Sequence, residues 1–495
     1  MTTFIIGLVI LFGGGLGYGK FVEHVFKPDD RPTPAIAKED GVEYVPMSKF
    51  KNALIELLNI AGTGPIFGPI MGILFGPIAF ILIPIGCVVS GATHDYFAGM
   101  ISIREGGEQM PSLVGRFMGK GIYQLYNAFL CILMLLVGAV FIYTPGDIFV
   151  TGVLGKSASL NSPALWITYA VIFVYYLVAT LFPIDKIIGR IYPIFGAILL
   201  FSAVGIFFGI FVKDYSLTNI SSSALTWHGT YPDGITPIIP VFFVTVACGI
   251  TSGFHSTQAT LIGRSVRSER EGRMTFYNMM ILEGFIAMIW AAAAMGVYNR
   301  IGIAAGLQMQ ATGVVNYVAK DMLGSVGGMI ALLGIIVLPI TSGDTALRSL
   351  RLMLGEYLHV DMAKMKNKLG IAIPVFILVA IILFWAKYSP EGFTILWRYF
   401  SWANQTLAIF AFAMFSIYLM STRKGYAWIM TILPGMFYAF VTCAFIMNAQ
   451  IGFRMSWPLA YGVSAAFTII YTILIVRAGK KRGALERPLD NAAVS

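Results

Sequence analysis

Four ionisable side chains stand in stretches of sequence that are otherwise apolar, where a charge is costly. His94 and Asp95 end a run from residue 57 that contains no other Asp, Glu, Lys or Arg, and His255 and Glu283 occupy two later apolar runs. Ionisable groups at membrane depth are commonly functional, and imidazole can relay protons near neutral pH. We expect His94, Asp95 and Glu283 to couple ion movement, and His255 to contact a substrate carboxylate or carry a proton. The alternative is that these groups form only buried structural pairs.

Two glycine-rich segments interrupt apolar runs. The first is Ala61-Gly-Thr-Gly-Pro-Ile-Phe-Gly-Pro-Ile70, and the second is Ala247-Cys-Gly-Ile-Thr-Ser-Gly-Phe-His-Ser-Thr257. Proline lacks an N–H and clashes with the preceding turn, and glycine weakens a helix, so both segments predict a broken helix. Broken helices in membrane carriers leave backbone groups free to hold substrate. The candidate substrate-binding residues are Gly62, Thr63, Gly64, Phe67, Gly68, Gly249, Thr251, Ser252, Gly253 and His255.

The glycines of the first segment have a second interpretation. Gly64, Gly68, Gly72 and Gly76 are spaced by four, which is typical of a small-residue stripe that lets two helices pack closely. Such a stripe explains the glycines but not the two prolines between them.

A third polar group closes another apolar run and consists of Thr341, Ser342 and Asp344. Together with backbone carbonyls of the first glycine-rich segment, these oxygens form a candidate site for a hard cation. The alternative is that the hydroxyls bond back to their own turn, as Ser and Thr often do in membrane helices. Asn404 and Gln405 are expected to form hydrogen bonds between helices.

The composition places all these residues in a membrane protein. Of 495 residues, 57% are hydrophobic and 12% are charged, whereas soluble domains carry roughly 25% charged residues. A spanning helix needs about 20 mostly apolar residues, and the first such segment is expected to be retained because no basic residue precedes it. The predicted spans lie near residues 3–19, 51–72, 75–103, 121–145, 162–181, 186–212, 236–262, 274–299, 324–345, 369–386, 396–420, 427–448 and 454–476.

The order of these spans suggests an internal repeat. The second and seventh spans carry the two predicted breaks, run in opposite directions and each open a set of five. This is the pattern of a LeuT-like inverted-repeat core. We therefore predict an all-α polytopic membrane protein of about 13 transmembrane helices, with one extra N-terminal and two extra C-terminal helices. The predicted parts are an N-terminal helix and loop (1–50), a first repeat (51–212), a second repeat (236–420), and two C-terminal helices with a tail (421–495).

The distribution of basic residues predicts the orientation. With the C-terminus inside, 27 of the 34 Lys and Arg residues fall in cytoplasmic loops, a strong positive-inside bias. The N-terminus is then outside. The long apolar run after residue 57 must double back at Phe75-Gly76-Pro77, and the stretch 346–368 reads as an amphipathic helix on the inner surface.

Several classes of protein are disfavoured. The four cysteines are widely spaced in apolar runs, which argues against disulfide frameworks and zinc fingers. No basic domain indicates nucleic-acid binding, and no GxxxxGK[ST] motif indicates ATP binding. We expect neither a cofactor nor a resident metal, an ion gradient of H+ or Na+ as the energy source, and no enzymatic activity.

Several segments together resemble the carbon starvation protein CstA family. They include the first glycine-rich segment, Ser90-Gly-Ala-Thr-His-Asp95, Cys248-Gly-Ile-Thr-Ser-Gly-Phe-His255, Ile340-Thr-Ser-Gly-Asp-Thr-Ala-Leu-Arg348 and Trp402-Ala-Asn-Gln-Thr-Leu-Ala408. Where the chain has Ala92-Thr-His-Asp95, the family pattern reads Ala-Val-Gln-Asp.

The resemblance implies a multi-pass carrier of the bacterial inner membrane with a fold related to the LeuT type. It implies import of small peptides or, in some members, pyruvate, driven by an ion gradient and working by alternating access. The expected partners are a small-molecule substrate and the lipid bilayer; the sequence does not indicate an oligomeric state. A channel and a nutrient sensor are the rival interpretations.

Overall fold

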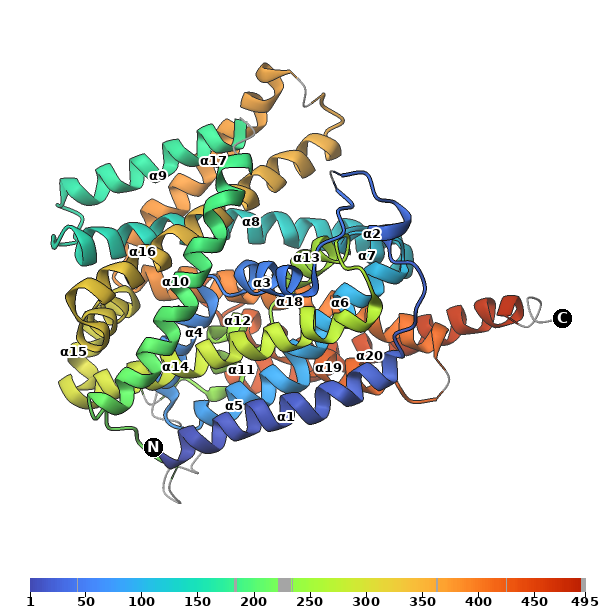
Figure 1. Ribbon diagram of the computed structural model, residues 1–495, viewed down its shortest axis with the longest axis horizontal. Coiled ribbons are helices and arrows are strands. Elements are labelled where there is room, and N and C mark those ends of the chain that lie inside the picture. The colour runs from blue at the N-terminus through green and yellow to red at the C-terminus, as the bar shows by residue number, and fades with distance from the viewer. Residues whose placement is uncertain are drawn as a thin grey trace.

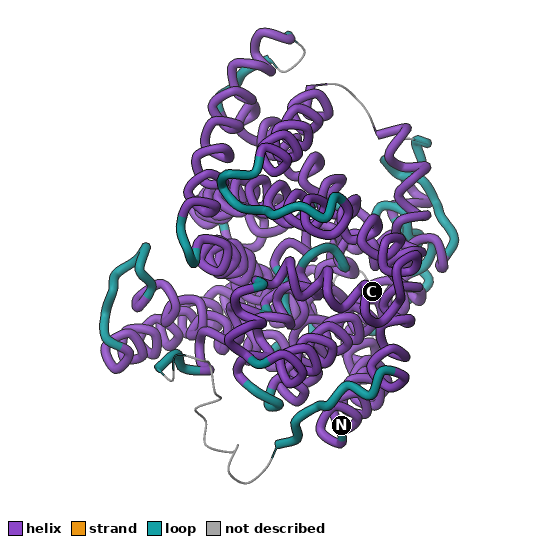
Figure 2. The backbone as a smooth tube through the Cα atoms, turned by 90° about the vertical axis from the view of Figure 1, so that its left-hand side faces the viewer, coloured by secondary structure: helices purple, strands orange, loops and turns teal. Residues whose placement is uncertain are grey.

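The structure of the chain is a computed structural model that describes residues 1–41, 43–181, 185–220, 233, 235–361, 364–423 and 425–490. Within these residues it contains helices and loops, with one isolated bridge between Met47 and Val266 and no strand (Figure 2). The helices of the first half are α1 (Thr2–Phe26), α2 (Pro34–Ala37), α3 (Lys49–Ile60), α4 (Gly64–Gly72), η1 (Ile73–Phe75), α5 (Ala79–Gly86), η2 (Cys87–Gly91), α6 (Ala92–Arg104), α7 (Met110–Met118), α8 (Lys120–Ile148), η3 (Phe149–Val153), α9 (Pro163–Leu181) and α10 (Asp185–Val212). Those of the second half are α11 (Ile238–Thr245), α12 (Ala247–Ile250), α13 (Gly253–Ile262), η4 (Glu269–Glu271), η5 (Arg273–Tyr277), α14 (Asn278–Ile301), α15 (Ile303–Gln308), α16 (Gln310–Tyr357), α17 (Met365–Tyr388), α18 (Gly392–Thr422), α19 (Ile429–Asn448) and α20 (Trp457–Asp490).

The helices have the length and composition of membrane spans. In the described part of the chain, nine are long and apolar enough to cross a membrane, or ten if the bent pair Lys49–Ile60 and Gly64–Phe75 is counted as one span. Two shorter apolar helices, Pro163–Ala179 and Gly196–Val212, add to these. The predicted all-α membrane architecture is confirmed, whereas the count of 13, the inverted repeat and the four-part division stay predictions.

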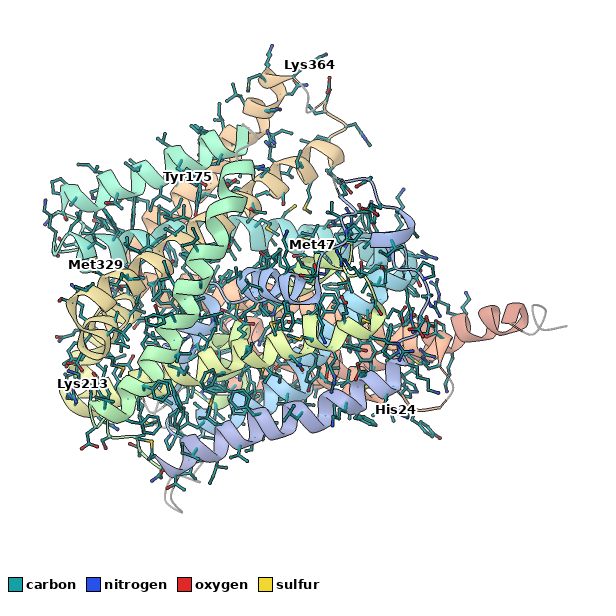
Figure 3. All side chains as sticks on the ribbon, in the orientation of Figure 1. His24, Met47, Tyr175, Lys213, Met329 and Lys364 are labelled. Atoms are coloured by element: carbon teal, nitrogen blue, oxygen red, sulfur yellow. The ribbon has the colours of Figure 1, made fainter. Side chains whose placement is uncertain are left out.

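Two helices form the centre of the bundle. The apolar stretches of α14 and α18 are buried along nearly their whole length, whereas those of α1 and α20 remain mostly exposed. Outward apolar side chains such as Val9 and Ile469 are what a bundle surrounded by lipid requires. Side chains fill the space between the central helices (Figure 3).

The start of α1 and the end of α20 lie toward opposite ends of the long axis (Figure 1). His24, near the end of α1, and Lys213, just after α10, also lie at opposite ends (Figure 3). This arrangement is compatible with termini on opposite sides of a membrane; which side is cytoplasmic stays a prediction.

The predicted reversal after the second span is present. The η1 turn ends at Phe75, and Gly76 adopts φ 92°, where a side chain would be strained. The chain then returns as α5, η2 and α6, which together form one span from Ala79 to Arg104.

The predicted surface helix within 346–368 is wrong in one respect. Residues 346–357 continue α16 without interruption, and Leu347 and Leu350 are buried inside the bundle. Leu347 packs against Gly138 of α8. Pro339 and Gly343 lie shortly before this stretch, yet neither ends α16.

The end of the bundle where α6 ends and α3 begins is closed by polar contacts. Arg104, at the end of α6, forms an ion pair of 2.8 Å with the fully buried carboxylate of Glu269, which also accepts a hydrogen bond from the Asp29 backbone. Arg31 lies 3.7 Å from Glu269 and holds the pKa of the Asp29 carboxyl well below its usual range. Thr33 donates to the Val266 carbonyl. The loop after α1 is thereby tied to the loop between α13 and α14.

Candidate functional site

The second span breaks where its glycines predict. The α3 helix ends at Ile60, α4 starts at Gly64, and the two are bent by 48°. Pro65 lies in the first turn of α4, where a missing N–H costs no hydrogen bond. Pro69 lies inside α4. The break therefore involves residues 61–63, and the second proline does not extend it.

The seventh span breaks at two extended residues. The α12 helix ends at Ile250, Thr251 and Ser252 have extended backbone, and α13 begins at Gly253. The Thr251 hydroxyl donates to Ser90 Oγ at 2.7 Å. This break lies within the predicted segment.

Asn404 of α18 supports the second break. Its Oδ1 accepts hydrogen bonds from the Ser252 hydroxyl at 3.1 Å and from the Phe254 backbone N–H at 2.8 Å. Gln405 donates to the Phe243 carbonyl of α11 at 2.8 Å. Both residues form the hydrogen bonds between helices that the sequence predicts.

The two broken helices pack directly against each other through glycine. A Cβ on Gly64 would lie 2.1 Å from the Cβ of Cys248, and one on Gly72 would lie 2.2 Å from a Val246 methyl carbon. A Cβ on Gly68 would lie 3.0 Å from the Thr245 carbonyl oxygen. The small-residue stripe and the break therefore coexist.

Replacing Gly64 with alanine should destabilise the protein by about 1–3 kcal/mol, because the added methyl group forces α4 away from α12. The measurement is the midpoint of thermal unfolding in detergent. Gly17→Ala is the matched control, since nothing lies within 4 Å of a Cβ at that position of α1. Equal midpoints for the two variants would contradict the packing role.

The remaining candidate substrate residues line the same region. The Thr63 side chain is buried and its hydroxyl has no hydrogen-bond partner in the described part of the chain. A Cβ on Gly62 would meet open space, whereas one on Gly249 would lie 2.9 Å from Ala287. Phe67 stacks its ring among Phe393 and Trp397.

The structure brings the four predicted ionisable residues into one chain of contacts. Asp95 Oδ1 lies 2.8 Å from His94 Nδ1, and Asp95 Oδ2 lies 3.0 Å from His255 Nδ1. The other ring nitrogen of His255 lies 3.5 Å from Glu283 Oε2. All four side chains are buried, and His255 lies only three residues after the second break. The chain of contacts joins α6, α13 and α14.

Each histidine has a distinct environment. His94 Nε2 has no hydrogen-bond partner among the described residues, and its ring packs against Phe412 and Phe415. A bare ring nitrogen beside aromatic rings fits a neutral imidazole that carries its proton on Nδ1 and donates it to Asp95. His255 contacts a carboxylate through each nitrogen, so it can accept a proton on one side while holding Asp95 on the other.

A third carboxylate, which the sequence analysis did not single out, lies in the same region. Glu56 of α3 is completely buried and lies within electrostatic reach of Asp95 and Glu283. Asn52, Glu56 and Ile60 are spaced by four and all buried. An acid on the buried face of a helix that leads into a predicted break was the signal that could have identified it.

The candidate cation residues have other contacts. Asp344 lies 3.2 Å from Arg348 and accepts from the Tyr175 hydroxyl at 3.4 Å. Thr341 donates to the Leu338 carbonyl of its own turn, and Ser342 is partly buried beside it. A cation site formed by Thr341, Ser342 and Asp344 stays a prediction.

Another buried ion pair was also missed. Lys387 of α17 lies 2.6 Å from Asp147 of α8, which also accepts a hydrogen bond from the Tyr169 hydroxyl. Lys387 lies 4.7 Å from the centre of the Tyr143 ring. Lys387 directly follows the predicted span 369–386, and no local signal indicates a partner 240 residues away.

The described residues contain no group of three or more His, Cys, Asp and Glu side chains arranged to hold a metal ion.

Comparison with solved structures reveals a known transporter fold. The manganese transporter of Eremococcus coleocola matches with a TM-score of 0.54 at 12% identity, covering 87% of this chain and 94% of that chain. A mutant of that transporter gives a TM-score of 0.56 at 11% identity, covering 89% and 97%. At this identity the likeness concerns the fold alone.

Comparison with other sequences identifies relatives. An uncharacterized membrane protein of Haemophilus influenzae is 43% identical over 342 residues, covering 60% of this chain and 92% of its own. The peptide transporter CstA of Escherichia coli is 22% identical over 562 residues, covering 88% and 80%. The pyruvate/proton symporter BtsT of E. coli is 26% identical over 320 residues, covering 53% and 44%.

A family model also matches. The model of carbon starvation protein CstA aligns with residues 1–179, 143–320 and 290–445 and so covers most of the sequence. The motifs around both breaks and around Asp95 lie inside these matches. The chain belongs to the carbon starvation protein CstA family.

Proposed function

We propose that this protein is a proton-coupled secondary transporter that imports small peptides across a bacterial inner membrane by alternating access. The observation that carries the proposal is the pair of hydrogen bonds that Asp95 accepts from His94 and His255. His255 belongs to the helix that follows the second break, so the bond joins the expected substrate region to a chain of protonatable groups. Movement of that helix would change the contacts that hold the proton.

The geometry near the first break favours a substrate that carries both a negative and a positive group. The N-terminus of α4 presents partial positive charge, which suits a carboxylate, and the C-terminus of α3 presents partial negative charge, which suits an ammonium group. The two ends lie on either side of residues 61–63. A peptide carries both groups, and a family relative is named a peptide transporter.

Protons suit the central contacts better than sodium. Two imidazoles and two carboxylates in line provide groups that exchange protons near neutral pH. A sodium site instead needs several oxygen ligands around one point, whereas both Asp95 oxygens are occupied by ring nitrogens. In the predicted orientation, with the N-terminus outside and the C-terminus in the cytoplasm, these residues lie on the cytoplasmic side of both breaks.

Pyruvate is the second candidate substrate. A family relative is named a pyruvate/proton symporter, and a carboxylate alone needs only the N-terminal end of α4. The two substrates differ in the ammonium group, so direct comparison separates them.

The test is uptake by proteoliposomes that contain the purified protein. Labelled dipeptide or tripeptide should accumulate when the outside is acidic and should fail to accumulate under a sodium gradient alone. His255→Ala should lower proton-driven accumulation at least about tenfold, equivalent to about 1.4 kcal/mol, because it removes the link between Asp95 and Glu283. His359→Ala, at an exposed histidine, is the matched control and should leave uptake unchanged.

Other outcomes identify the alternatives. Accumulation of pyruvate without accumulation of peptide would replace the proposed substrate. Accumulation driven by sodium would replace the proposed ion. Flux that fails to saturate with substrate would favour a channel, and the absence of any gradient-dependent accumulation would reject a secondary transporter.

A further inference from the structure

Glu56 is a buried acid that lies near Asp95 and Glu283 but outside the chain of contacts from His94 to Glu283. Its exposed fraction is 0%, and neither carboxylate oxygen has a hydrogen-bond partner among the described residues. No Lys or Arg forms an ion pair with it in that part of the chain. Its electrostatic neighbours, Asp95 and Glu283, are both acids.

Within the part of the chain that the structure describes, the surroundings of Glu56 offer no stable counter-charge. The helices packed against α3 are α10, α13, α14 and the η5 turn. His255 belongs to α13 and Glu283 to α14, while Arg273 of η5 is paired with Glu23 at 3.0 Å. The described side chains of α10, residues 194 and 196–212, include no charged group. Among the described residues, an ionised Glu56 would therefore be a buried charge without a partner.

The protons of the neighbouring groups can be counted. With the proton of each imidazole placed on Nδ1, both rings donate to Asp95, which is then the ionised acceptor of two N–H groups. His94 is neutral because its other nitrogen is bare and lacks a partner. Glu283 Oε2 lies 3.5 Å from His255 Nε2, and neither Glu283 oxygen has a hydrogen-bond partner among the described residues. We assign one further proton to this pair, either as imidazolium and carboxylate or as imidazole and carboxylic acid. In both forms His94, Asp95, His255 and Glu283 together carry one net negative charge.

A second negative charge on Glu56 would be costly. An isolated buried carboxylate costs several kcal/mol even after the protein relaxes, and such a group normally binds a proton instead. Glu56 is thus expected to be a neutral carboxylic acid while it is buried as in this structure. The proton on Glu56 is separate from the proton shared by His255 and Glu283, since no hydrogen bond connects the two sites among the described residues.

We propose that Glu56 is a second proton-carrying residue, so that two protons enter the cell with each substrate molecule. This inference rests on the proposed function, because it assigns a proton stoichiometry to that transport. Glu56 lies about one turn before the break at residues 61–63, so bending there moves it relative to Asp95 and Glu283. When the cytoplasmic end opens, water can solvate the carboxylate, and the O–H bond of Glu56 breaks to give a carboxylate and a proton released to water.

The experiment measures how many protons accompany each substrate. Proteoliposomes are clamped at zero membrane potential with a pH difference of one unit, and the equilibrium accumulation of a zwitterionic dipeptide is determined. Two protons per peptide predict about hundredfold accumulation, and one proton predicts about tenfold, since each tenfold step corresponds to about 1.4 kcal/mol. The wild type should approach the first value and Glu56→Gln the second.

A second readout separates proton carriage from a structural role. Glutamine has the shape of the protonated acid, so E56Q should retain counterflow, the exchange of labelled for unlabelled peptide without any gradient. Glu56→Asp, which keeps an ionisable group, should retain the two-proton value. Glu39→Gln, at an exposed acid, is the matched control and should behave as the wild type.

The possible results are distinct. A wild type that accumulates peptide about tenfold, or an E56Q variant that keeps the wild-type value, would overturn the inference while leaving proton coupling intact. Loss of counterflow in E56Q with retention in E56D would also overturn it, because Glu56 would then contact substrate or support the fold. A wild type without any proton-driven accumulation would instead reject the proposed function.

Discussion

Asp95→Asn is expected to abolish proton-driven accumulation while leaving the protein folded. The carboxylate accepts a hydrogen bond from each of two histidines, at 2.8 Å and 3.0 Å. An amide of nearly the same size provides one oxygen acceptor, so its NH2 group must face one of the two ring nitrogens. The negative charge that stabilises a protonated His255 is also lost. Proton transfer by positioned groups typically contributes about 10² or more to a rate, and we expect a loss of about that size.

Initial rates of peptide uptake under an inward proton gradient measure this effect. Asp214→Asn is the matched control because Asp214 is exposed, lies at φ 49° and tolerates asparagine in that conformation. Thermal unfolding in detergent confirms that both variants fold. If D95N accumulated peptide as well as D214N does, Asp95 would have only a structural role.

Lys387→Met is expected to produce the largest loss of stability among single changes away from the central contacts. It leaves the buried carboxylate of Asp147 without its partner at 2.6 Å, and breaking a buried ion pair on one side costs about 3–5 kcal/mol. The Tyr169 hydroxyl still donates to Asp147 but supplies no positive charge. The midpoint of thermal unfolding in detergent should fall by several degrees.

The double variant D147N/K387M tests the cause. It removes both charges, and replacing both partners of a buried pair is often neutral for stability. The unfolding midpoint should therefore return toward the wild-type value. Lys364→Met is the matched control, because its partner Asp361 and Lys364 itself are exposed. A double variant as unstable as K387M would show that the lysine stem, rather than the charge, supports the packing.

The sequence predicted best what depends on local chemistry. Both breaks occur where glycine and proline weaken a helix, and the reversal occurs at Gly76, which needs positive φ. Pro69 shows the limit of this reasoning. The same residue type that weakens one helix lies inside α4, where its neighbours Gly68 and Gly72 pack against the end of α11 and Val246.

The sequence predicted the individual residues of the candidate site but not the contacts between them. The sequence identifies four ionisable residues within apolar runs, namely His94, Asp95, His255 and Glu283. Their contacts join α6, α13 and α14, and such distances depend on tertiary packing that no local pattern encodes.

The sequence pattern did not indicate Glu56 or the Asp147–Lys387 pair, for a related reason. Both lie near the ends of predicted spans, where charged residues are ordinary and usually face water. Their burial depends on which helices cover those ends. For Asp344, the partner Arg348 is four residues away on the same helix, whereas Tyr175 becomes a partner only when α9 and α16 are placed side by side.

The two breaks differ in how firmly they are held. Asn404 binds both sides of the break at Thr251 and Ser252, whereas the hydroxyl of Thr63 has no hydrogen-bond partner among the described residues and a Cβ at Gly62 would meet open space. A hinge operates where the fewest bonds must be broken. The first broken helix is thus expected to be the element that moves during the transport cycle. The helices α13 and α18 stay packed against each other and keep their positions. Drugs or antibodies that immobilise residues 61–63 would then arrest the cycle, while those that bind near Asn404 would leave it running.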